Sequence, residues 1–214
     1  MESAARDNMP LVIYFPSEGA TDAEFSGVDI ARLSQNNAVF IKVPFTTDRE
    51  KSPWLEETVV PTSRLLSDNP SRDYKVPVGK ATVIVADAWG NEYYRTTSIP
   101  AVTQLRGWLV KVSDRVEKEN AKLAKNLEKA REAVQNSNRK DAVKLLLTNF
   151  KDGVVGLEAQ EESIRLYHEI MDATRTEVSE LKAAGNKTGL QALLKDFKKT
   201  DVEKEIDEAL KSLK

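Results

Sequence analysis

The chain has 214 residues, of which 40% are hydrophobic and 31% are charged, and its formal net charge is -2. These values fit one large or two small globular domains. The nearly balanced charge gives no general electrostatic reason to expect nucleic acid or an anionic membrane as partner. Cysteine is absent, which excludes disulfides, thiolate metal sites and thiol nucleophiles.

The hydropathy pattern and the first residues bear on location. No apolar run reaches the ~18–20 residues that a membrane span requires, so no span is expected. Residues 1–7 lack a basic region followed by an apolar core, so no signal peptide is expected there. The compartment stays open, and a periplasmic or secreted location is expected only if a leader peptide has been removed.

The first hundred residues combine short β-branched runs with helical patterns. A helix is predicted at residues 22–36, and a second at 60–66 within a long Pro-rich stretch. Residues 87–91 supply turn chemistry, which predicts an antiparallel hairpin of the last two strands. The first and third strands are continuously apolar, as expected of central strands. The predicted strands are residues 11–15, 38–44, 81–86 and 91–96.

After Pro100 the pattern becomes helical. Apolar residues recur at spacings of mostly three and four from Leu105 to Val134, with no proline between them. This pattern predicts one helix over about residues 101–135, which closes a first domain and continues beyond it. The predicted domains are therefore residues 1–113 and 114–214, with the long helix shared between them.

The second half contains a weak repeat of 47 residues. The segment 139–151 aligns with the segment 186–198, and both contain a Leu-Leu-x-x-Phe pattern. Each copy follows a helix that ends in a polar turn, and each precedes another helix. This arrangement resembles a tetratricopeptide-type hairpin. A plain antiparallel helical bundle explains the same apolar stripe, so both interpretations stay open.

The first half resembles the thioredoxin-like superfamily over about residues 8–115. The resemblance rests on the apolar strand Leu11–Phe15, the helix after it, the strand from Ala38, and the segment from Val76 to Glu92. It implies an α/β fold with a mixed central sheet flanked by helices, followed here by an all-α helical-hairpin domain. In that family a Cys-x-x-Cys pair follows the first strand. The matching positions in this chain are Ala20 and Ala23, so dithiol chemistry is impossible.

A second diagnostic feature of the family is also missing. The family places a cis-proline just before its third strand, where the peptide backbone contacts substrate polypeptide, and the matching residue here is Ala81. A cis bond before a non-proline residue costs ~2.5–4 kcal/mol, so a trans bond is expected. Engineering could explain Ala20 and Ala23 alone, but it would not explain Ala81. Natural loss of the redox centre is the better interpretation.

Few other residues suggest chemistry. His168 is the only histidine, and it has no cysteine or second histidine with which to form a metal site or a catalytic triad. No metal or cofactor is therefore expected. Trp89, Tyr93 and Tyr94 cluster near the predicted hairpin as candidates for a binding surface, although packing within the fold is the more common fate of such residues.

The leading hypothesis is a redox-inactive thioredoxin-like protein that binds other proteins as an interaction, chaperone or escort module and is not an enzyme. One alternative is a glutathione-transferase-like enzyme, for which Tyr14 or Ser17 could be nominated. That family's proline before the third strand and its Glu-Ser pair are missing here. A second alternative is a structural subunit of an assembly. The sequence identifies no particular partner.

Overall fold

The computed structural model describes residues 8–17, 25, 27–36, 38–44, 46–48, 50 and 58–213. The chain divides into two compact units. The first contains residues 1–55 and 62–119, and the second contains residues 56–61 and 120–214. The chain is therefore a small α/β unit together with an all-helical unit, as the composition of its two halves predicts.

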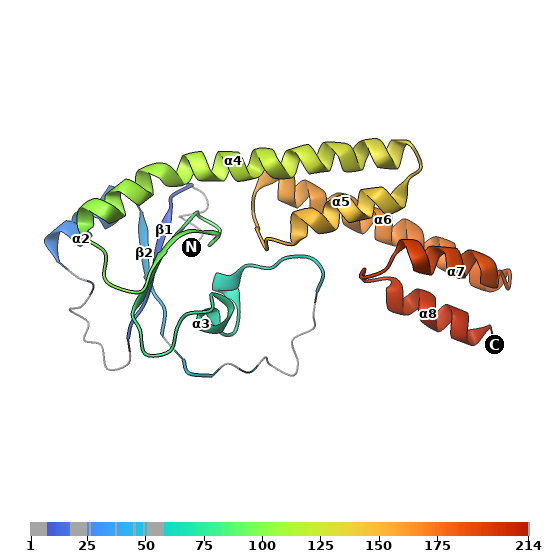
Figure 1. Ribbon diagram of the computed structural model, residues 1–214, viewed down its shortest axis with the longest axis horizontal. Helices are drawn as coiled ribbons and strands as arrows, with labels where there is room; N and C mark the ends of the chain where they lie inside the picture. Colours follow the sequence, from blue (N-terminus) through green and yellow to red (C-terminus); the bar gives the residue numbers. More distant parts are fainter. Residues whose placement is uncertain are drawn as a thin grey trace. The chain divides into compact units, whose positions relative to one another are not determined.

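Within its described residues, the first unit is built on a mixed sheet of four strands in the order β2-β1-β3-β4, of which Figure 1 labels β1 and β2. β1 pairs in parallel with β2, antiparallel pairing joins β1 to β3, and β3 and β4 form an antiparallel hairpin. The parallel pair requires a crossover, which contains helix α2. The elements span Leu11–Phe15 (β1), Val28–Asn36 (α2), Val39–Lys42 (β2), Thr82–Ala86 (β3) and Glu92–Thr96 (β4).

Both central strands are buried on both faces, which explains their uninterrupted apolar sequences. Alternate residues of β1 point to opposite faces, so that Leu11 and Ile13 join one core while Val12 and Tyr14 join the other. The second of these cores is closed by α2 and by the first turns of α4, Val102–Gln135. The first is closed by the segment that contains Leu65 and Tyr74.

The prediction of a helix at residues 60–66 is wrong. Only a single 3-10 turn, η1, forms there, at Arg64–Leu66, and the short helix α3 follows at Pro70–Asp73. Pro70 disfavours a helical conformation at Asn69, so too few residues remain to offset the cost of starting a helix. The Asn69 side chain instead caps α3 by accepting a 3.0 Å hydrogen bond from the Arg72 backbone N–H.

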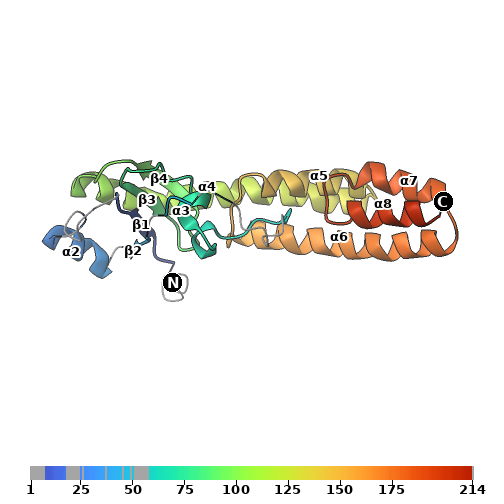
Figure 2. The ribbon, with the colours of Figure 1, turned by 90° about the horizontal axis from the view of Figure 1, so that it is seen from below.

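The second unit consists of helices, and Figure 2 shows α5, α7 and α8 lying alongside α6. Its core is filled by side chains from the last turns of α4 and from all four later helices. Val59 and Val60, from the segment that precedes η1, also pack against this core. The four later helices span Arg139–Phe150 (α5), Glu158–Ala183 (α6), Lys187–Asp196 (α7) and Glu203–Ser212 (α8).

Two turns in this unit have the same hydrogen-bond geometry. The turn after α4 is closed by the N–H of Asn138 bonding to the carbonyl of Ala133, and the turn after α6 by Asn186 bonding to Leu181, both at 2.8 Å. Each asparagine then caps the next helix, where its side chain accepts a backbone N–H. One asparagine thus ends one helix and begins the next, which keeps both connections short.

Candidate functional site

The positions expected from the thioredoxin-like resemblance are described only in part. Ala20 and Ala23 lie outside the described residues. Ala81 lies directly before β3, is half-buried, and packs against the core that α2 and α4 close. No cis peptide bond occurs in the described part of the chain, so the bond before Ala81 is trans, as the energy cost predicts.

A buried carboxylate organises the turn between β3 and β4. Asp87 is 3% exposed, and its oxygens accept hydrogen bonds from the backbone N–H groups of Trp89 (2.9 Å) and Asn91 (3.0 Å). They also accept from the Asn91 side-chain amide at 2.7 Å and from the Tyr93 hydroxyl at 3.3 Å. Burial raises the pKa of the Asp87 carboxyl, while the donors favour its charged form. These bonds define the conformation of the turn.

The backbone of Trp89 is held on both sides. Its N–H donates to Asp87, and its carbonyl accepts a 3.1 Å hydrogen bond from the Ser63 hydroxyl beside η1. The next residue, Gly90, has a φ of +87°, and a Cβ there would come within 2.8 Å of the Tyr74 hydroxyl oxygen. Only glycine fits this position without displacement. The turn is therefore rigid at the point where it presents an indole ring.

The side chain of Trp89 is 42% exposed, although its backbone is fixed. Leu66, which ends η1, is 72% exposed. η1 and the turn belong together, because the Ser63 hydroxyl bonds to Trp89 and the Leu65 side chain lies against Gly90. We call Trp89 and Leu66 the apolar rim. An aromatic and an aliphatic side chain left in water on a rigid support suit a protein-binding surface.

Tyr93 and Tyr94 do not share this exposure, because both are half-buried against the core beneath α4. A register shift between Val85 and Ala86 places Glu92 and Tyr94 opposite successive residues of β3, and this bulge directs both tyrosines to one face. Tyr94 stacks on Trp108 with ring centroids 5.5 Å apart. Of the three aromatic candidates, only Trp89 is presented to solvent.

A recess of about 310 Å³ lies between β1, β2 and α2. Its walls are mainly apolar, with the ring of Phe25 set 5.0 Å from that of Tyr14 and 5.9 Å from that of Phe40. Among the described residues that line it, Lys42 carries the one ionisable amine and no side chain is a carboxylate. Tyr14 is 5% exposed and Ser17 is half-buried. The described part of this lining thus contains no acid and base pair of the kind that general catalysis needs.

Other candidate chemistry is equally sparse. His168 is exposed on α6, with its ring 5.8 Å from that of Tyr167. Among the described residues, no group of three or more histidine, cysteine, aspartate or glutamate side chains could hold a metal ion. Across the same described ranges, no helix combines the length and the apolar character needed to cross a membrane. Comparisons with known protein families, curated protein sequences and solved structures find no match to this chain.

Sequence reasoning identified Trp89 but missed its neighbours. Ser63 and Leu66 lie in the stretch for which a longer helix was predicted, so no signal pointed to their place beside the turn. An Asp-x-x-Gly-Asn sequence predicts a turn, and the buried carboxylate that fixes it follows from that pattern. The exposure of Leu66 is a tertiary property that no local pattern encodes.

Proposed function

We propose that this chain is a redox-inactive thioredoxin-like protein that binds polypeptides through the apolar rim of Trp89 and Leu66. The observation that carries the proposal is Trp89, an exposed indole on a backbone held by Asp87 on one side and Ser63 on the other. A fixed backbone loses little conformational entropy on binding, and tryptophan contributes strongly to protein interfaces.

The sheet order supports the thioredoxin-like part of the proposal. A β-α-β start, a β3–β4 hairpin and a closing helix are the order that the superfamily resemblance implies. Ala81 carries no thiol and has a trans peptide bond, so the chain lacks a group able to exchange disulfides at that corner. The two repeated turns of the second unit support a tetratricopeptide-like hairpin stack, a type of structure that serves protein binding.

Aggregation of insulin during reduction by dithiothreitol tests this function in one assay. A dithiol enzyme accelerates the precipitation of the released chains, whereas a protein that binds them delays it. We expect the wild-type chain to delay precipitation, measured by light scattering. Unchanged or accelerated precipitation would contradict the proposal.

Matched variants locate the surface. Trp89→Ser and Leu66→Ser should each abolish most of the delay, because each removes an exposed apolar contact. Val110→Ser is the control, since Val110 is 74% exposed on α4 and outside the rim. Equal loss of the delay in the control would show that general surface hydrophobicity, and not the rim, binds the client.

A further inference from the structure

Helix α4 carries a row of basic residues, none of which belongs to the apolar rim. Six lysines and arginines recur at alternating spacings of four and three, and all are exposed. At 100° per residue they fall within a sector of about 80°, and every helix position in that sector over this length is basic. We call them the basic row; its members are Lys111, Arg115, Lys118, Lys122, Lys125 and Lys129.

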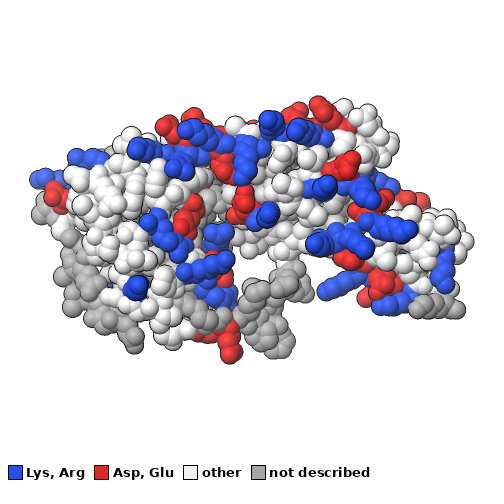
Figure 3. Space-filling view, in the orientation of Figure 1, with Lys and Arg blue, Asp and Glu red and all other residues white. Residues whose placement is uncertain are grey.

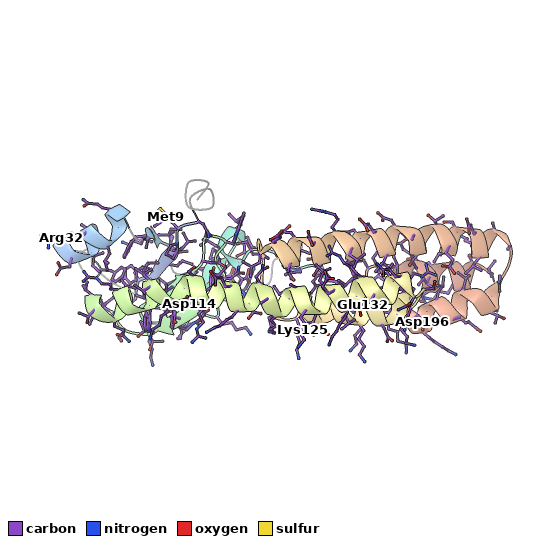
Figure 4. All side chains as sticks on the ribbon, turned by 90° about the horizontal axis from the view of Figure 1, so that it is seen from above. Met9, Arg32, Asp114, Lys125, Glu132 and Asp196 are labelled. Carbon is purple, nitrogen blue, oxygen red and sulfur yellow. The ribbon has the colours of Figure 1, made fainter. Side chains whose placement is uncertain are left out.

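The row is narrow, and exposed acidic residues border it on one side. On that side, Asp114 and Glu132 lie about 60° around the helix from the centre of the row, and Glu128 and Glu117 lie about 100° and 120° from it. Figure 3 shows Lys and Arg gathered along the edge formed by α4, with Asp and Glu among them. Figure 4 labels Lys125 between Asp114 and Glu132 on this helix. The row lies on one helix, and the periodicity of that helix alone brings its members into line.

Most members of the row form no ion pair with another described residue. Lys122 bonds to Asp152 at 2.7 Å, and the Arg115 guanidinium lies 5.3 Å from the centre of the Tyr94 ring. Within the described residues, the other four members form no ion pair, namely Lys111, Lys118, Lys125 and Lys129. The nearby carboxylate of Glu128 is engaged by Arg131 at 2.9 Å. Four ammonium groups are thus available to a partner.

We infer that the basic row binds an acidic helical segment of a partner protein, with carboxylates spaced three and four residues apart along one face. The row extends over about 27 Å, at 1.5 Å per residue, and is one side chain wide, which matches one helix. A flat anionic membrane or a nucleic acid duplex would also approach the acidic border, where like charges repel.

A pair of helical peptides tests the spacing. Each has about 20 residues, about 30 Å as a helix, with identical composition. One, the row peptide, places its glutamates on one face at alternating spacings of three and four. The other distributes its glutamates around the helix. We expect the first peptide to bind the full chain more tightly at about 20 mM salt and to weaken strongly at about 200 mM, because exposed charges are screened. Binding is measured by fluorescence anisotropy.

Neutralising the four unpaired lysines tests the surface. The variant K111Q/K118Q/K125Q/K129Q should bind the row peptide about tenfold more weakly or worse, since several exposed ion pairs are lost together. The control variant K187Q/K195Q/K198Q/K204Q removes four exposed lysines of other segments and should bind normally. Trp89→Ser should also bind the peptide normally, so this inference and the proposed function can fail separately.

Several outcomes would overturn the inference. These are equal binding of both peptides, equal losses in the two lysine variants, and no measurable binding at low salt. Tighter binding to duplex DNA or to phosphatidylserine vesicles than to the row peptide would assign the row to a different polyanion. Circular dichroism checks that the variants keep their helices, and the salt dependence of the wild type tests the inference without any variant.

Discussion

Ser137 and Gly185 occupy the same left-handed position at the two repeated turns, with φ values of +58° and +65°. Each N–H closes its turn by bonding to a carbonyl three residues earlier, at 2.9 Å for Ser137 and 3.1 Å for Gly185. Glycine tolerates this conformation, whereas a side chain is strained there. The first turn therefore carries a strain that the second avoids.

Exchanging these two residues tests the strain. Ser137→Gly should stabilise the second unit by about 0.5–1 kcal/mol and Gly185→Ser should destabilise it by a similar amount, because relief of strain exceeds the entropy glycine adds to the unfolded chain. Urea unfolding followed by circular dichroism measures both. The double variant should return close to the wild type. Destabilisation by both single changes would show that the serine hydroxyl matters more than the backbone.

The repeat shows how far the sequence predicts this unit. The alignment at 47 residues correctly pairs the buried stripes, for example Val143 with Leu190 and Phe150 with Phe197. The capping asparagines, Asn138 and Asn186, are instead 48 residues apart. One additional residue thus separates the cap from the stripe in the first copy. Hydrophobic pattern dominates a sequence alignment, whereas caps depend on single side chains, so the alignment missed this shift.

The first unit was predictable where local pattern and burial agree. The strand Leu11–Phe15 and the β3–β4 hairpin were predicted from apolar runs and turn residues. The packing of Val59 and Val60 with the helical unit was not predictable, because it depends on contacts distant in sequence. Contacts distant in sequence also determine the site. The sequence gives Trp89 and Tyr93 similar surroundings, and only the turn fixed by Asp87 and the bulge in β4 leave the ring of Trp89 exposed and that of Tyr93 packed in the core.

Loss of the Asp87 carboxylate should loosen the β3–β4 turn. Asp87→Ala leaves the N–H groups of Trp89 and Asn91 buried without their acceptor, which costs about 2–4 kcal/mol of unfolding free energy. Tryptophan fluorescence reports on this unit, since all three tryptophans lie at positions that belong to it. Asp114→Ala, an exposed change on α4, should stay within about 0.5 kcal/mol. A cost for Asp87→Ala no larger than the control would contradict this role.

Disturbing a polar network in the second unit should cost about as much unfolding free energy as the loss of the Asp87 carboxylate. The Asn149 side chain donates to the Leu123 carbonyl at 3.0 Å and to the Ser163 hydroxyl at 2.9 Å, and accepts from Asn126 at 2.9 Å. Asn149→Ala should cost about 3 kcal/mol, because it leaves several buried groups unpaired. Asn126→Ala, which removes one half-buried partner, should cost about 1 kcal/mol. Urea unfolding by circular dichroism compares the two, and the reverse order would contradict this account.

Alkaline pH should weaken the second unit through Tyr167. This side chain is fully buried, its hydroxyl oxygen accepts a 3.2 Å hydrogen bond from the Asp201 backbone N–H, and burial raises its pKa to about 12. In the unfolded chain tyrosine titrates near pH ~10. The stability that depends on protonated Tyr167 is thus complete below pH ~10 and is lost as the pH rises toward 12, by about tenfold in the unfolding constant per pH unit.

Tyr167→Phe isolates this effect from other alkaline titrations. The variant loses the bond from Asp201 and about 1 kcal/mol at neutral pH, but it has no phenol to ionise. Its stability should therefore fall less steeply than that of the wild type above pH ~10. Circular dichroism during urea unfolding measures both slopes. Tyr74 and Tyr93 belong to the other unit and are present in both proteins, so they leave the comparison unchanged. Equal slopes would show that Tyr167 ionises as readily in the folded chain as in the unfolded one.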